Sequence, residues 1–433
     1  MKKRSSGVLI ATEHRKDYVH AINKSIIHRF ETVGNLSRSI ARNPSDPEAY
    51  FKRALAYSRK GLTRQAIDDF NRAIELDPYN AASYANRGAV YIRLKDYARA
   101  IADCSRAIKL DSDSSAGYFN RGFAYLMKNN YGFAIADFNR IIRLKPTMTA
   151  AYANRGRAYH GQKNYDRSIE DISHALSLEK QPPLVSADWH FSRGCAYYDN
   201  GGYDQAIADF NRVIALGLNE AQVYYNRGLA YTGKNDDDRA LADFDRCVEL
   251  DPDYARAYDQ RGCVHRQKGD HDRAIEDFEK ALELDPNFAA AHCNRGIAYC
   301  EKGDYDRAIE DLDRTIKLGA NDATTRYHRG LAFMRKNDYD RAMADLDLAI
   351  KLERRHAAAY HQRGLAHFGK GDCDRAIEDY NRAIALDPAF GAAYTDRGFA
   401  YHQKSEQYQA LAEANWEKGD AGDDRAGKRL FRR

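Results

Sequence analysis

One short segment returns along this chain at a fixed interval. Residues 84–91 read Tyr-Ala-Asn-Arg-Gly-Ala-Val-Tyr, and near-copies begin at 152, 224 and 292. An Arg-Gly pair recurs every 34 residues from 87/88 to 397/398, with one longer step of 38 residues between Arg155 and Arg193. A fixed period of this length marks a repeat architecture, and it constrains the fold more strongly than composition does.

The period divides the chain into eleven repeats when the Gly of the Arg-Gly pair is counted as position 8. Residues 47–182 hold repeats one to four, 183–186 are an insertion, and 187–424 hold repeats five to eleven. Residues 1–46 are a candidate degenerate half-repeat that caps the array, and 425–433 form a basic tail. No independent catalytic domain of ordinary size fits in what is left.

Each repeat carries the pattern of two helices. Positions 4, 7, 8 and 11 recur as aromatic, Arg, Gly and Tyr, and this spacing of three and four residues makes one face of a helix. A Lys-Gly or Lys-Asn pair then ends the first helix. A second amphipathic run follows, such as the one that begins at Asp306, where an Asp is a start signal. In four repeats the second helix is closed by Asp-Pro, because proline cannot continue a helix.

Two places depart from this pattern. The insertion Pro183–Ser186 predicts a longer loop or one added helical turn near Trp189. Repeat eleven has Ala414 and Glu417 where other repeats have large or apolar residues, so it is expected to be a polar cap.

These positions resemble the signature of the tetratricopeptide repeat (TPR) family over residues 47 to about 417. Gly or Ala fills position 8 in every repeat, position 11 is Tyr, Phe or His, and position 20 is Ala in all repeats but one, which has Ser168. Small residues at positions 8 and 20 let two helices approach closely, and large ones at 11 and 24 fill the remaining space. The resemblance implies an all-α fold, a right-handed superhelical solenoid of antiparallel helix pairs.

A charged pair recurs with the repeats. Position 7 is Arg throughout, and position 23 is Asp in the first ten repeats. In an antiparallel helix pair these two positions lie at the same height, so we expect an ion pair inside each repeat, with a structural role. The clearest examples are Arg87–Asp103, Arg121–Asp137, Arg227–Asp243 and Arg295–Asp311.

A row of carboxamides marks the surface most suited to binding. Positions 2, 6, 9 and 13 share the first-helix face opposite the packing face, and in the TPR family this face lines a concave groove. Position 6 carries Asn86, Asn120, Asn154, Asn226, Asn294, Gln260 and Gln362. A carboxamide can bind both the C=O and the N–H of an extended peptide. A similar asparagine ladder holds substrate peptide in O-linked N-acetylglucosamine transferase. The alternative is that these side chains are simply solvated.

Two other kinds of site are disfavoured. Chaperone-binding TPR proteins clamp a carboxylate with Lys at position 5 and Asn at position 9, and here neither residue occurs at its position. Cys263, Cys293 and Cys300 lie near one another on the first-helix face, with His265 and His292 at packing positions. Their spacing is looser than that of metal ligands, so no metal or other cofactor is expected.

Composition limits the functional classes further. The 68 basic and 63 acidic residues nearly balance, which does not favour nucleic-acid binding. Seven cysteines without a CxxC motif suggest reduced thiols. No apolar run reaches the ~20 residues that a membrane span needs. We therefore expect a cytoplasmic protein that is not bound to a membrane.

The sequence thus predicts a non-enzymatic scaffold that holds an extended or helical segment of a partner protein in its groove. Two alternatives stay open: a single-stranded RNA-binding solenoid that stacks bases on aromatic residues, and a regulatory or targeting subunit of an enzyme on another chain. No nucleophile–base, metal or phosphate-loop constellation indicates an active site or a small-molecule ligand.

Overall fold

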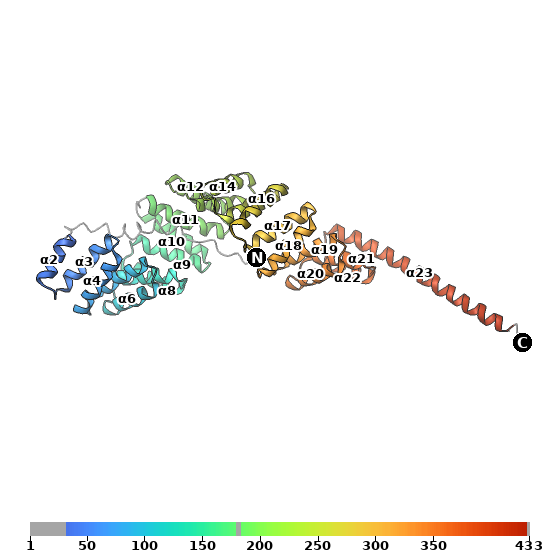
Figure 1. Cartoon of the computed structure of the whole chain (residues 1–433), viewed down its shortest axis with the longest axis horizontal. Helices are drawn as coiled ribbons and strands as arrows, with labels where there is room; N and C mark the ends of the chain where they lie inside the picture. The colour runs from blue at the N-terminus through green and yellow to red at the C-terminus, as the bar shows by residue number, and fades with distance from the viewer. Residues whose placement is uncertain (1–31, 179–182, 431–433) are drawn as a thin grey trace. The chain divides into compact units, whose positions relative to one another are not determined.

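The computed structural model describes residues 32–178 and 183–430, and within these the chain is helical without strands (Figure 1). Two compact blocks divide the chain, Lys2–Leu250 and Asp251–Arg433. Consecutive helices form antiparallel pairs joined by short turns. The all-α architecture of paired helices that the sequence predicts is therefore confirmed.

The helices of the N-terminal block are α2 (Val33–Arg42), α3 (Pro47–Arg59), α4 (Thr63–Leu76), α5 (Ala81–Arg93), α6 (Tyr97–Leu110), α7 (Ser115–Met127), α8 (Tyr131–Leu144), α9 (Thr149–Gly161), α10 (Tyr165–Leu178), α11 (Pro183–Asp199), α12 (Tyr203–Ala215), α13 (Ala221–Gly233) and α14 (Asp237–Leu250). Those of the C-terminal block are α15 (Ala255–Gln267), α16 (His271–Leu284), α17 (Ala289–Lys302), α18 (Tyr305–Lys317), α19 (Ala323–Arg335), α20 (Tyr339–Leu352), α21 (Ala357–Gly369), α22 (Cys373–Leu386) and α23 (Gly391–Leu430).

A left-handed residue at position 15 separates the two helices of each of the first ten repeats. Glycine fills this position in five repeats, with φ from +74° to +88°, and Asn fills it in three. Lys95 and Lys163 adopt the same conformation without the freedom of glycine. In six of these repeats the second helix then begins after an Asp whose side chain caps it, whereas Leu62, Asn130 and Gly202 precede the second helix without a side-chain cap. In repeat eight that cap is Asp304, which accepts from the Arg307 N–H at 3.1 Å, and not Asp306, which lies inside the first turn.

The core of each repeat lies between its two helices. At position 8 the glycine brings the first helix against the residue at position 24, which is fully buried. A Cβ added to Gly228 would lie 2.8 Å from a ring carbon of Phe244, and one added to Gly262 would lie equally close to Phe278. Close helix approach therefore requires the glycine, and the large residue at position 24 fills the space that it leaves.

The N-terminal block contains two departures from the repeat. Helix α11 has 17 residues where α9 and α13 have 13, so the inserted residues lengthen the first helix of repeat five at its start. Helix α2 precedes repeat one and buries Leu36 and Ile40, as the second helix of a repeat would. The expected half-repeat also includes residues 1–31, which lie outside the described part of the chain.

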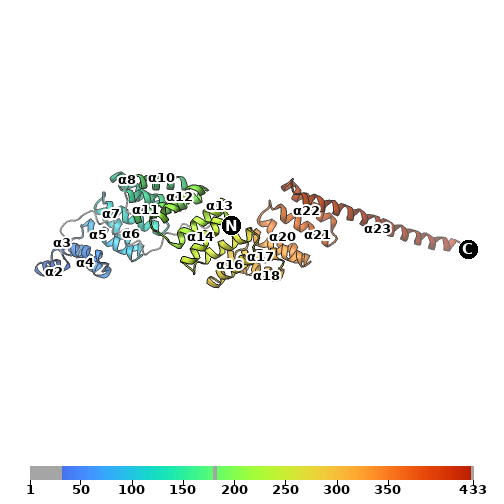
Figure 2. The same ribbon diagram turned by 90° about the horizontal axis from the view of Figure 1, so that it is seen from above.

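Repeat eleven does not form a helix pair. We expected a first helix, a turn and a polar second helix, but α23 runs from Gly391 to Leu430 without a break and extends past α22 in both views (Figures 1 and 2). At the turn, Ser405 and Glu406 replace the left-handed Gly, Asn or Lys and the Asp that caps the second helix in six repeats. Ala414 also replaces the large residue of position 24, so repeat eleven lacks both the turn signals and the packing residue that separate two helices elsewhere.

Candidate functional site

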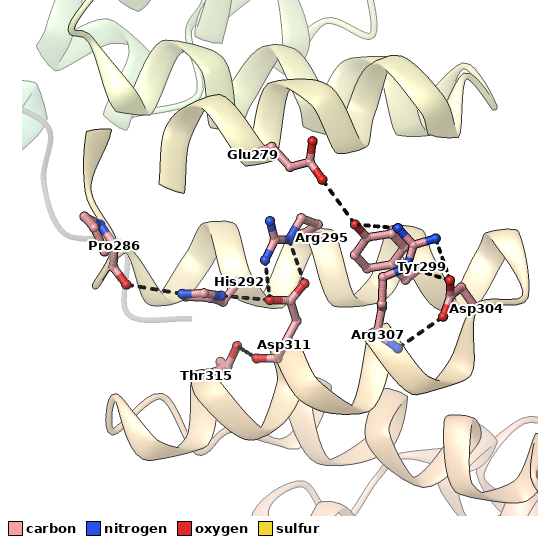
Figure 3. Close-up of polar contacts among 9 residues, drawn as sticks. All are labelled: Glu279, Pro286, His292, Arg295, Tyr299, Asp304, Arg307, Asp311 and Thr315. Atoms are coloured by element: carbon pink, nitrogen blue, oxygen red, sulfur yellow. Dashed lines mark hydrogen bonds and ion pairs between the residues drawn. The ribbon is translucent and has the colours of Figure 1, made fainter. Parts of the chain in front are cut away.

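Arginine at position 7 and aspartate at position 23 form a bidentate ion pair in each of the ten repeats that have both residues. The shortest N–O distance in each pair is 2.6–2.8 Å. In repeat eight, Arg295 Nε and Nη2 donate to the two oxygens of Asp311 at 2.7 and 2.8 Å (Figure 3). The arginine of one helix thus holds the carboxylate of the other, as the sequence predicts.

The same arginines also join neighbouring repeats, which the sequence analysis missed. In repeat two, Arg87 Nη1 donates to Asn71 Oδ1 of repeat one at 2.7 Å. In repeat ten, Arg363 Nη1 donates to Asp347 Oδ1 of repeat nine at 2.6 Å. In repeats two to six and nine to eleven the acceptor is the residue at position 25 of the preceding repeat, which is Asn, Ser or Asp, and that recurrence is the sequence signal for it. In the repeats of this set that also have the aspartate, one guanidinium therefore fixes both its own helix pair and the contact to the preceding repeat.

Histidine strengthens the ion pair in two repeats. His292 Nδ1 lies 2.9 Å from Asp311 Oδ1, and His190 Nδ1 lies 2.7 Å from Asp209 Oδ1. Burial alone would raise the pKa of Asp311, but the hydrogen bonds from Arg295 and His292 hold that pKa below its ordinary value. These carboxylates are thus held ionised inside the fold and are structural rather than catalytic.

The position-6 carboxamides on the first-helix face do not form one uniform row. Asn154 and Asn226 are buried, with exposed fractions of 0% and 4%, and each donates to the carbonyl four residues earlier in its own helix. Asn86, Asn120 and Asn294 are half-buried. The prediction of a continuous peptide-binding row therefore needs correction, because no ligand reaches Asn154 or Asn226 without a rearrangement.

The half-buried asparagines use part of their hydrogen-bonding capacity within the fold. Asn86 Nδ2 donates to Ala82 O at 2.8 Å, and Asn120 Nδ2 donates to Ala85 O of the preceding repeat at 3.0 Å. A primary amide has a second N–H and a carbonyl oxygen besides. Each of these side chains can therefore still bind a peptide group while it keeps its bond to the fold.

A buried carboxylate on the first-helix face of the C-terminal block escaped the sequence analysis. Asp259 is only 3% exposed and accepts from Asn294 Nδ2 at 2.8 Å and from Gln260 Nε2 at 3.1 Å. Burial raises its pKa from 3.8 to about 6. The sequence contains a signal for this residue, because position 5 is aromatic or small in most other repeats and is a carboxylate only at Asp259.

Asp259 interacts with the thiols of Cys263 and Cys293. Burial raises the pKa of Cys263 and raises that of Cys293 to about 11. Protonated thiols are weak nucleophiles and poor metal ligands. Among the residues that the structure describes, no group of His, Cys, Asp and Glu is arranged to hold a metal ion.

Asp259→Asn is expected to remove a pH dependence of stability. The folded-state pKa lies above the unfolded value, so the contribution of the protonated form is fully present below about pH 4 and is lost as pH rises through about 6. At neutral pH the ionisation of Asp259 lowers the free energy of unfolding by roughly 2–3 kcal/mol. Urea unfolding of both proteins at pH values from 4 to 7 measures it: the wild type should lose stability relative to the variant as pH rises, and a constant difference would contradict the assignment.

Gln260 and Gln362, the remaining predicted contacts, lie in the C-terminal block and are half-buried. Gln260 is bound to Asp259, and Gln362 follows His361, whose Nε2 lies 2.7 Å from Asp396 Oδ2 of repeat eleven. The structure thus brings Gln260 and Asn294 together at Asp259. Gln362 lies two repeats from Asn294 along the chain.

Among the described helices, none combines the length and apolar character needed to cross a membrane.

Sequence comparisons agree with the repeat pattern. Family profiles described as tetratricopeptide repeat match residues 47–80, 81–114, 149–182, 191–255 and 293–360, and one described as TPR repeat matches 262–301 and 368–405. No curated protein sequence matches the chain.

Several solved structures are similar to this chain over part of its length. YrrB, described as a TPR protein with an unusual peptide-binding site, is 25% identical over 44% of this chain and 97% of its own, with a TM-score of 0.39. MamA from Desulfovibrio magneticus is 21% identical over 40% and 97%, with a TM-score of 0.37. A tetratricopeptide repeat protein from Parabacteroides merdae is 18% identical over 58% and 98%, with a TM-score of 0.47.

Proposed function

This chain belongs to the tetratricopeptide repeat family, and from that premise we propose that it is a non-enzymatic scaffold that binds an extended segment of a partner protein along its first-helix face. The TPR fold is typical of protein–protein interaction scaffolds, since stacked repeats create a long surface that no single repeat has. The segment lies across Asn86 and Asn120 in the N-terminal block. In the C-terminal block the corresponding contact is Asn294.

One observation carries this proposal: Asn86 and Asn120 are half-buried carboxamides in adjacent repeats, and each has one N–H bonded inside the fold. Asparagine is unfavourable inside a helix by about 0.6 kcal/mol relative to alanine. The internal bond orients each amide, so a peptide group meets a donor and an acceptor whose positions are already set. Backbone recognition of this kind does not depend on the side chains of the partner.

Two of the aromatic residues at position 5 are unsuited to an RNA-binding function. Phe191 and Tyr225 are buried, and their rings lie 5.7 and 6.0 Å from the core rings of Phe210 and Phe244. A ring that stacks on a base must present its face to solvent. These rings instead fill the space between the helices of their own repeat.

The test compares accessible and buried asparagines in the same block. Peptides are selected on the full chain from a displayed random library, and their affinities are measured by fluorescence anisotropy. The variant Asn86→Ala, Asn120→Ala is expected to bind about tenfold or more weakly, because two hydrogen bonds are lost. The control Asn154→Ala, Asn226→Ala, which removes only internal bonds, should keep the affinity if it remains folded.

Two outcomes would contradict the proposal. One is a peptide affinity that both double variants leave unchanged. The other is a failure to select any peptide while a labelled oligouridine binds with a steep salt dependence, which would favour the RNA-binding alternative.

A further inference from the structure

Helix α23 carries a helix-packing face that lacks its partner helix. In repeats one to ten the residues at positions 4, 7, 8 and 11 of the first helix pack on the second helix of the same repeat. The corresponding residues of repeat eleven are Tyr394, Arg397, Gly398 and Tyr401, which we call the open face. Another side of α23 is covered, because Ala393 and Ala400 are fully buried.

The open face is more exposed than its counterparts. Tyr394 and Tyr401 are 44% and 53% exposed, whereas the residues at positions 4 and 11 of repeats one to ten are half-buried or buried, down to 3% exposed for Tyr299. A Cβ added to Gly398 would meet no described atom within 4 Å, while one added to Gly296 would lie 2.9 Å from Leu312. The hollow that receives the residue at position 24 is therefore present and unfilled.

The set of contacts made by Arg397 is also incomplete. Its Nη1 donates to Asn381 Oδ1 at 2.6 Å, which repeats the contact to the preceding repeat, and its guanidinium lies over the ring of Tyr394 at 5.2 Å. In the ten complete repeats the other edge of this guanidinium holds the aspartate of position 23. Among the residues with described side chains, no carboxylate occupies that edge of Arg397. Position 23 of repeat eleven is Glu413, but it follows along the same continuous helix, so α23 does not fold back to place this position against Arg397.

The chain's own sequence is poorly suited to cover this face. A second helix of repeat eleven would need a left-handed residue and a cap at 405 and 406, which are Ser and Glu, and a large residue at 414, which is Ala. The continuous helix α23 agrees with that reading. The described part of the chain therefore supplies no second helix for this face, and the charge of Arg397 favours an occupant that carries a carboxylate.

We propose that the open face of α23 docks a helix of a partner protein that carries Asp followed directly by a large apolar residue, so that the eleventh repeat is completed in trans. The charge of Arg397 requires the Asp, and the hollow at Gly398 requires the large residue. The contact would continue, in the same C-terminal block, the interface that Asp311-Leu312, Asp345-Leu346 and Asp379-Tyr380 make within their repeats. This site is separate from the first-helix face and does not rest on the function proposed for it.

A synthetic peptide tests the chemistry of the occupant. The probe is residues 270–285 of this chain, which contain Asp277-Phe278 and both caps of α16, acetylated and labelled with a fluorophore. It should bind the full chain saturably. Peptides with Asp277→Asn or with Phe278→Ala should bind about tenfold or more weakly, because each loses one of the two recognised groups.

Two variants of the full chain test the site. Gly398→Leu fills the hollow without a clash, and leucine favours a helix more than glycine does, so α23 should remain folded while peptide binding is lost. Arg397→Leu should weaken binding about tenfold or more, and Arg382→Leu, which replaces an exposed arginine on α22, should not change it. Circular dichroism melting verifies that each variant is folded.

Three results would overturn the proposal. The first is the absence of saturable binding of the labelled peptide to the wild-type chain. The second is equal affinity for wild type and Gly398→Leu. The third is a wild-type dimer in sedimentation velocity that Gly398→Leu dissociates, since that result would assign the face to a second copy of the chain.

Discussion

Asp311→Ala is expected to lower the free energy of local unfolding of repeat eight by about 3 kcal/mol, because it leaves Arg295 and His292 without their shared carboxylate (Figure 3). Asp311 is almost fully buried, so water cannot replace it easily. Removal of one partner of a buried pair costs more than the pair itself contributes. Native-state hydrogen exchange of peptides from α17 and α18 measures the local free energy.

The neighbouring residue provides the control. Glu310 precedes Asp311 on α18 and is exposed, so Glu310→Ala should change the local free energy by less than about 0.5 kcal/mol. The double variant Arg295→Met, Asp311→Leu should restore most of the loss, because apolar residues of similar volume need no partner. If Asp311→Ala cost less than about 1 kcal/mol, the ion pair would not be a principal constraint on the repeat.

The ion pair also gives stability a pH dependence. The folded-state pKa of Asp311 is lowered below 3.8, so the stabilisation is present above that pH and is lost as pH falls through the folded-state value. This dependence has the opposite sign to that of Asp259, which destabilises the fold as it ionises. The two carboxylates can therefore be told apart by titration.

Phe278→Ala is expected to lower the free energy of unfolding by about 3–5 kcal/mol. The ring is fully buried in a cluster that includes Ala298, Tyr299 and Ala332, so the change removes apolar contacts and leaves a cavity. The glycine at position 262 cannot fill that space, since it has no side chain. Urea unfolding followed by far-UV circular dichroism measures the loss.

A conservative variant separates volume from shape at this position. Repeats eight and nine have Leu312 and Leu346 where repeat seven has Phe278, so Phe278→Leu should cost only about 1–1.5 kcal/mol. A loss as large as that of the alanine variant would show that these repeats are not interchangeable in their packing.

The repeated elements of the fold could be predicted from the sequence because each signal occurs many times. The period, the small residues at positions 8 and 20 and the Arg–Asp pair all depend on contacts within one repeat, where sequence spacing fixes which side chains meet. The contact from Arg87 to Asn71 was missed because it joins two repeats. A pattern within one repeat does not show which residue of the preceding repeat accepts a hydrogen bond from Nη1 of the guanidinium.

The candidate site was predicted less well, because burial differs between repeats that share a sequence pattern. Asn154 and Asn86 occupy the same position, yet only Asn154 lies near an arginine, Arg157, whose Nη1 is 3.5 Å from its side-chain oxygen. Arg157 itself is held by Asp188 and Ser192 of repeat five. At Asn154, the contacts of Arg157 with repeat five accompany complete burial of the amide, and a pattern within one repeat does not show them.

The end of the array was predicted incorrectly for a related reason. The positions of repeat eleven follow the pattern up to the turn, and the pattern suggested a second helix. Lys95 and Lys163 make the same left-handed turn in other repeats, so Ser405 alone does not account for the continuous helix. The changes to Glu406 at the cap position and to Ala414 at position 24 accompany it.

Hydrogen–deuterium exchange of the full chain, with and without a selected peptide ligand, tests the central claim most directly. The account predicts that the ligand slows exchange in α5 and α7, whose first-helix face presents Asn86 and Asn120, and leaves the second helices α4 and α6 unchanged. Protection confined to the second helices, or to α23 alone, would contradict the claim that the first-helix face holds the partner.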